Sequence, residues 1–417
     1  MLVFFAFMSG RLPHLQCMAF AAVLCGMARQ GHAQVEYRLT AGSTLGATDN
    51  SRAQTVGTDA KQADGFLMAR AGAQLGYLGQ LVRYHGAYAF GATTWARGTQ
   101  STSLTHSLNL ASEIQTSTSS QTTLGAGATL GQLSLVDAIG TTNPQTVGTR
   151  PAGTQTFMTV EAREAFLWQF AAMWRLDQTL EGRLYLPVGD NSGSAQNRIL
   201  THGLGIARLW LRDQAGLRTR VGVIETRGSA PVGQTVIPGR ESEFAEALLG
   251  WRHSLTPDWT SDLAAGAFVV RIPDSGMHPA AAGLVSVSYQ REGQALELRA
   301  ARTAEPNGYL GTMLERSLVS LTAGLTIGRW QALRLDTTAS FEHDSSPGTA
   351  SGTAPTANFL FFQAGARYLP GDMFMYRLQY TFRDQLSSGA APGTSPFAAF
   401  RQQMVLLTVE VHYPTGP

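Results

Sequence analysis

The stretch Met373–Gln385, MFMYRLQYTFRDQ, alternates between apolar and polar side chains. Successive side chains of a β-strand point to opposite faces, so this stretch predicts a strand with one apolar and one polar side. Arg316–Gly328 and Gln331–Asp344 repeat the pattern. The apolar positions of the first stretch are Phe374, Tyr376, Leu378, Tyr380 and Phe382, and between them lie Arg377, Gln379, Thr381 and Arg383.

The alternating segments are longer than the strands of ordinary globular proteins. Each extends over about 11–16 residues, whereas a globular strand has about five or six. A strand that crosses a bilayer at a tilt needs about 9–11 residues in the apolar layer. About eighteen such segments follow one another between Val35 and Tyr413. The lengths therefore favour membrane-spanning strands, although an array of soluble secreted β-sandwiches remains an alternative.

The connections between the segments alternate in length. Short ones are expected at Ser117–Ser120 and Arg291–Gln294, and longer ones at 137–153 and 344–356. Because backbone groups in lipid must all be paired, a sheet can span a membrane only when it closes. The pattern predicts an all-β fold, a transmembrane antiparallel up-and-down barrel of about 18 strands with short periplasmic turns and longer extracellular loops. Residues 155–188 are ambiguous, because Glu161–Trp174 also fits an amphipathic helix.

The chain resembles the outer-membrane β-barrel proteins of Gram-negative bacteria, over roughly residues 35–413. The final segment supports the resemblance, with an alternating apolar set that ends at Tyr413. Such an ending is similar to the C-terminal signal that the barrel-assembly machinery reads. It departs from that signal because Pro414–Pro417 follow the aromatic residue. The resemblance implies location in the outer membrane, in contact with the lipid bilayer and lipopolysaccharide.

Residues 1–33 are expected to be a cleavable secretory signal peptide, which leaves 34–417 as the barrel. Arg11 precedes the apolar run Met18–Met27, and Gly31-His32-Ala33 fits a cleavage site. An N-terminal membrane anchor is the alternative. The two cysteines, Cys17 and Cys25, both lie in this segment, so the exported chain would have no disulfide.

Aromatic residues beside the expected short turns predict an interfacial girdle. Trp and Tyr favour the boundary between membrane and water, where an apolar ring and a polar tip are both satisfied. Scattered core aromatics are the alternative interpretation. The predicted girdle comprises Trp251, Trp259, Trp330, Tyr77 and Tyr289.

The charged side chains fall on the polar side of the segments, so they are expected to face the lumen. A charge on the lipid side would cost about 2–4 kcal/mol at the midplane. Two interpretations remain open: an ionic network that makes the barrel rigid, or a guide path for an anionic or hydroxyl-rich solute. The predicted pore-lining residues are Arg70, Arg83, Arg163, Arg218, Arg220, Glu246, Arg252, Arg334, Asp336, Glu342, Arg377 and Arg383.

No motif in the sequence predicts an enzyme, a metal site or a cofactor. The nine histidines show no spacing typical of zinc ligands. Gly189–Gly193 superficially resembles a serine-hydrolase loop, but ordinary turn chemistry explains it. The net charge of +2 gives no reason to expect nucleic-acid binding.

The sequence leaves several functions open. A large barrel with modest loops and no apparent plug resembles the barrels of polysaccharide-export translocons. That resemblance implies a periplasmic polysaccharide-export protein as partner and a polysaccharide in the lumen. A passive or sugar-selective porin for small solutes is the alternative, and a structural or adhesive outer-membrane protein is a third hypothesis. Lumenal aromatics, expected of a sugar porin, are not apparent in the sequence.

Overall fold

The computed structural model describes residues 34–51, 62–132, 156–188, 196–228, 240–273, 275–309, 311–327, 332–346, 356–388 and 399–414. The predicted signal peptide and Trp330 lie outside these residues, as do most of the expected long loops. Within the described segments, no helix has the length and hydropathy needed to cross a membrane. Every regular element there is a β-strand.

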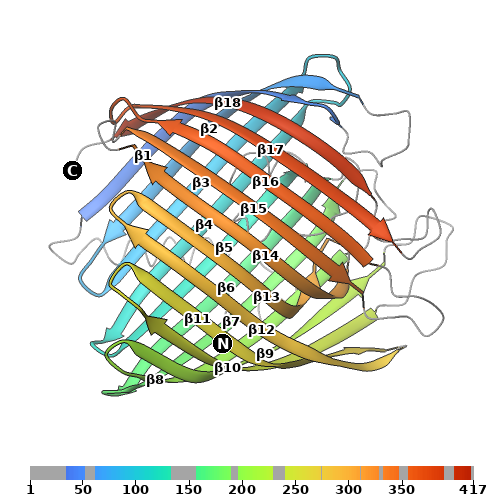
Figure 1. Ribbon diagram of the computed structural model, residues 1–417. Helices are drawn as coiled ribbons and strands as arrows, with labels where there is room; N and C mark the ends of the chain where they lie inside the picture. The colour runs from blue at the N-terminus through green and yellow to red at the C-terminus, as the bar shows by residue number, and fades with distance from the viewer. Residues whose placement is uncertain are drawn as a thin grey trace, which may run out of the picture.

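The strands form one closed antiparallel barrel of 18 strands (Figure 1). Each strand pairs with its neighbours in the sequence, and β18 pairs with β1 to close the ring. The first nine strands are β1 (Gln34–Thr48), β2 (Asp64–Leu78), β3 (Val82–Trp95), β4 (Ser103–Ser117), β5 (Ser120–Gln132), β6 (Thr156–Ala171), β7 (Trp174–Val188), β8 (Gln196–Leu209) and β9 (Asp213–Arg227). The others are β10 (Arg240–Ser254), β11 (Trp259–Ile272), β12 (Gly276–Arg291), β13 (Gln294–Asn307), β14 (Thr312–Thr326), β15 (Leu333–Ser345), β16 (Thr356–Tyr368), β17 (Phe374–Ser388) and β18 (Phe400–Pro414).

This architecture confirms the barrel and the strand number expected from the sequence. It excludes the helix considered for Glu161–Trp174, because β6 and β7 continue through that region as strands. Only Ala172 and Met173 separate the two strands, so β7 begins at Trp174, earlier than its alternating pattern indicates. The soluble sandwich array is also wrong, since one ring contains all the described strands.

The barrel has two different ends. At the turn end, tight connections such as 118–119 and 292–293 join the strands. Gln34, the first residue of β1, pairs there with Leu78, the last residue of β2. The other end, the loop end, carries most of the longer connections. Two connections there are nevertheless short, at 273–275 and 308–311. The expected alternation of loop length therefore fails at these two positions, and the second of them is important for the lumen.

The register fixes which side chains face outward. In β18, Val405, Leu407 and Tyr413 are about half exposed, whereas Met404 and Leu406 between them are buried. Because antiparallel partners share a face, this parity extends from strand to strand around the ring. The exposed apolar side chains form the outer surface, and the opposite set faces the lumen.

Candidate solute path in the lumen

The predicted pore-lining residues all lie on the inner face of the barrel by this register. Arg83 pairs with Glu113, Arg220 with Glu246, and Arg252 with Asp262 across adjacent strands. Arg334 and Asp336 pair with Arg367 and Gly365 of β16, and Arg377 of β17 also pairs with Arg367. That these side chains form a route for a solute stays a prediction.

Several of the predicted residues are engaged in ion pairs. Arg218 lies 3.2 Å from Asp262, and Arg334 lies 2.7 Å from Asp336. Arg220 contacts Glu246 at 3.7 Å. Arg83 approaches Glu113 only to 4.0 Å at the exposed rim. These contacts fit the interpretation of an ionic network that makes the wall rigid.

A more deeply buried ionic group was not recognised from the sequence. Arg316 contacts Glu342 at 3.2 Å and Asp344 at 3.4 Å, and both carboxylates are at most 2% exposed. Of this group, only Glu342 was among the predicted residues. Arg316 lies near the start of β14 and Asp344 near the end of β15, both at the loop end. The alternating pattern begins and ends there, so the sequence does not show which face of the sheet these two side chains occupy.

Another set of inner-face arginines has no ion pair. Arg163, Arg252, Arg299, Arg367 and Arg377 make no salt bridge or hydrogen bond with any described residue. Among the described residues, Arg70 donates only to the sulfur of Met68, at 3.2 Å. Arg367 and Arg377 face each other across β16 and β17. The strands that carry these arginines are β2, β6, β10, β13, β16 and β17. Each presents one guanidinium group to the interior, mostly in the half nearer the turn end.

A recess of about 370 Å³ opens on the inner wall between β3 and β7. Its polar lining includes Arg163, Glu161, His85 and Asn109, and Gly125 forms part of its surface. A methyl group placed on Gly125 would meet only the carbonyl oxygen of Leu110, at 3.9 Å. The absence of a side chain at Gly125 therefore helps to keep the recess open.

One hairpin leaves the wall and folds into the lumen. The pairing of β12 with β13 stops at Gly283 and Arg302, whereas β13 and β14 stay paired as far as Asn307 and Thr312. The pairing of β14 with β15 begins only at Glu315. In this part, β13 and β14 pair with each other and with no other described strand, and residues 303–309 and 311–314 are here called the inward hairpin.

Contacts with β8, β9 and β10 hold the inward hairpin. The Asn197 amide donates to the Gly308 carbonyl oxygen at 2.7 Å, and the Thr226 hydroxyl donates to that of Gly311 at 2.8 Å. Arg220 donates to the Ala304 carbonyl oxygen at 2.5 Å and lies 3.4 Å from Glu305. These partners are four or five strands away around the ring, so the hairpin folds inward, past β10–β12, into the lumen.

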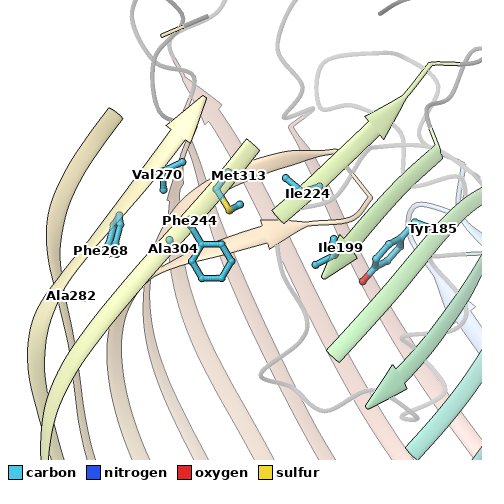
Figure 2. Close-up of a cluster of buried hydrophobic side chains, with 9 residues drawn as sticks. All are labelled: Tyr185, Ile199, Ile224, Phe244, Phe268, Val270, Ala282, Ala304 and Met313. Carbon is cyan, nitrogen blue, oxygen red and sulfur yellow. The ribbon is translucent and has the colours of Figure 1, made fainter. Parts of the chain in front are cut away.

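Apolar packing reinforces these polar contacts. Figure 2 shows Met313 and Ala304 of the inward hairpin between Ile224 on one side and Phe268 on the other. Tyr309 at the hairpin tip packs edge-on against Tyr185, with ring centroids 4.9 Å apart. Burial of each large apolar side chain contributes about 1.5–3 kcal/mol. The whole cluster comprises Tyr185, Ile199, Ile224, Phe244, Phe268, Val270, Ala282, Ala304 and Met313.

Other inner-face apolar groups fill the loop end elsewhere around the ring. Phe66 and Trp95 pack with Met404 and Leu406. Phe359, Phe361 and Phe400 form a separate cluster, and the Arg383 guanidinium lies 6.0 Å from the ring centre of Phe361. The expectation that lumenal positions lack aromatics is thus wrong for the loop end. Segments such as 359–362, FLFF, are apolar on both faces, so their alternation gave no signal.

The predicted girdle residues that the structure describes lie on the outer face near the turn end. The rings of Trp259 and Tyr289 are 4.8 Å apart, and those of Tyr77 and Tyr84 are 5.9 Å apart. The indole of Trp251 donates to Asp213 at 2.9 Å. This position suits an aromatic belt at a membrane interface, which stays a prediction.

Comparison with known proteins finds similar barrels among solved structures. No family model matches the chain, and no curated protein matches it in sequence. OccK2 (OpdF) of Pseudomonas aeruginosa is 10% identical, with a TM-score of 0.47 over 92% of this chain and 99% of that chain. OccAB3 of Acinetobacter baumannii is 10% identical, with a TM-score of 0.45 over 91% and 100%. OpdK of P. aeruginosa, solved with vanillate, is 10% identical, with a TM-score of 0.45 over 91% and 99%. The likeness is one of fold.

Proposed function

We propose that this protein is an outer-membrane channel for small anionic solutes. The observation that carries the proposal is the set of inner-face arginines without an ion-pair partner among the described residues. Arg163, Arg367 and Arg377 belong to this set. A guanidinium group that makes no internal ion pair keeps its donors available for a solute. Its planar fork matches the two oxygens of a carboxylate.

The shape of the lumen favours small molecules. The export hypothesis relied on an unobstructed interior, but the inward hairpin occupies part of the lumen and packs against the inner faces of β7–β11. A polymer chain would have less room to pass at this level of the barrel. The recess between β3 and β7, at about 370 Å³, has instead the size of a site for a small ligand. The proposal therefore follows the small-solute alternative, with anions as the preferred class.

Ion selectivity in planar bilayers tests the proposal. With a KCl gradient across the membrane, the reversal potential of the wild-type channel should show a preference for chloride. The double variant Arg367→Gln with Arg377→Gln should lose much of that preference, because two positive charges leave the inner wall. Arg208→Gln is the matched control, since Arg208 lies on the outer face near the same end.

Solute binding provides a second readout. Glucuronate and vanillate are suitable carboxylate probes, because OccK2 and OpdK were solved with them. Each should interrupt the ion current of the wild-type channel more than a neutral sugar of similar size. A cation-selective channel, or equal interruption by the neutral sugar, would contradict the proposal. A protein that inserts but never conducts would favour the structural or adhesive hypothesis.

A further inference from the structure

The outer face of β6–β8 differs from the rest of the outer surface. Glu164 lies near the middle of β6 and His202 near the middle of β8, and both face outward by the register. Leu180 of β7 lies between them in the same row of paired residues. Gln178 adds a polar amide to the outer face of β7. Together these residues form a polar patch at the height where the apolar band is expected.

The middle of the outer face on other strands is apolar or small. Arg302 on β13 is the other charged residue found near a midpoint there, and it is paired with Glu315 at 3.4 Å. Neither Glu164 nor His202 makes a hydrogen bond or ion pair with a described residue. Typical mid-strand residues of the outer face are Ala71, Leu110, Ala126, Ala247, Ala265, Val319, Ala339 and Leu407.

An unpaired ionisable group that faces hydrocarbon is unfavourable. The cost is largest at the bilayer midplane and falls toward the interfaces. Ionisable residues at membrane depth accordingly pair with one another or face a protein interior. The patch would avoid this cost if another protein surface, with complementary groups, covered it.

We infer that the polar patch of β6–β8 is the interface of a two-fold dimer. Glu164 and His202 lie one strand to either side of β7, so a two-fold axis beside β7 places Glu164 of each copy on the same side of the interface as the partner's His202. Such an interface uses the same patch on both copies and is self-complementary in charge. Ala162 and Gly182, which pair across β6 and β7, are small enough to let the two barrels approach closely.

The mass of the purified protein in detergent tests the inference. Wild type should have twice the mass of one chain. Glu164→Leu combined with His202→Leu should fold normally, because it makes the outer face more apolar, and should have the mass of a single chain. Ser43→Leu with Thr337→Leu is the control, since both residues lie on the outer face of strands far from β7.

Exchanging Glu164 and His202 distinguishes specific pairing between the two copies from an effect of polarity alone. Glu164→His alone should shift the protein toward monomer, because like groups would then face each other. Glu164→His with His202→Glu should restore the dimer. A wild-type monomer, or a dimer that persists in the double leucine variant, would overturn the inference.

Cross-linking in membranes gives a readout independent of detergent. Gly182→Cys on β7 should form a disulfide-linked dimer under oxidation, because it lies beside the proposed axis. Ala364→Cys on β16 should not, since β16 lies half-way around the 18-stranded ring. The wild-type protein controls for Cys17 and Cys25. Equal cross-linking at both engineered positions would contradict the proposed interface.

Discussion

The two halves of the lumen are built from the same strands but differ in chemistry. Toward the loop end, inner-face positions carry packed apolar groups such as Phe268, Phe359 and Phe361, each at most 2% exposed. Toward the turn end, the same parity carries arginines and acids that are open to water. One half is a packed core, which supplies rigidity, and the other is a wet, charged vestibule. The comparison teaches that a barrel of this size can narrow its own lumen without a separate plug domain, because one of its hairpins folds inward.

Displacement of the inward hairpin should cause the largest change, an increase in single-channel conductance. Gly311 has a φ of 66°, and a methyl group there would meet the Asn197 side-chain oxygen at 2.6 Å. Gly311→Val should therefore push the hairpin tip from β8 and raise single-channel conductance several-fold. Gly276→Val is the matched control, because Gly276 has a φ of 84° with nothing near its side-chain position. Equal conductance in the two variants would mean that the hairpin does not limit the current.

Truncation of the packed half should cost more stability than truncation of the charged half. Phe268→Ala removes a buried ring and should lower the free energy of unfolding by about 3–5 kcal/mol. Leu167→Ala, on the inner face near the turn end, should cost much less, because Leu167 is already 37% exposed. Urea titration in lipid vesicles measures both. Similar losses would show that the turn end is also packed in the membrane.

Filling the recess should change the residence time of carboxylates more than it changes the preference of the channel for chloride. Gly125→Leu places a side chain in the space that Arg163 and Glu161 line. Carboxylate residence times, measured from current interruptions, should shorten several-fold, while the chloride preference in KCl stays close to wild type. A change in chloride preference without a change in residence time would place the solute elsewhere.

The rim of the charged half should tolerate change best. Arg83 is largely exposed and lies 4.0 Å from Glu113. Exposed ion pairs contribute about 0–1 kcal/mol. Arg83→Gln should thus leave the unfolding midpoint unchanged within error, and a marked loss would show that the rim is structurally coupled to the vestibule.

Sequence periodicity predicted the wall of the barrel far better than its interior. Alternation depends only on the difference between lipid and water, and that contrast is sharp in segments such as Met373–Gln385. Alternation is absent where both faces of a strand are apolar. The sequence therefore does not predict that Phe359 and Phe361 are buried inside the barrel. The inward hairpin was missed for another reason. Thr303–Asn307 still reads as a strand, and its departure from the wall depends on distant partners such as Asn197 and Arg220.

The seam between the first and last strands has a consequence for biogenesis. The Thr44 and Thr408 hydroxyls are hydrogen-bonded across it at 2.9 Å, although the two residues are 364 positions apart in the chain. Closure must therefore wait until the whole polypeptide has been made. Until then, both unpaired borders of the growing sheet can recruit any passing strand. A cell that makes this protein must shield those borders until the chain reaches the membrane. The supply of chaperones, more than the stability of the closed barrel, should therefore limit the yield of folded protein.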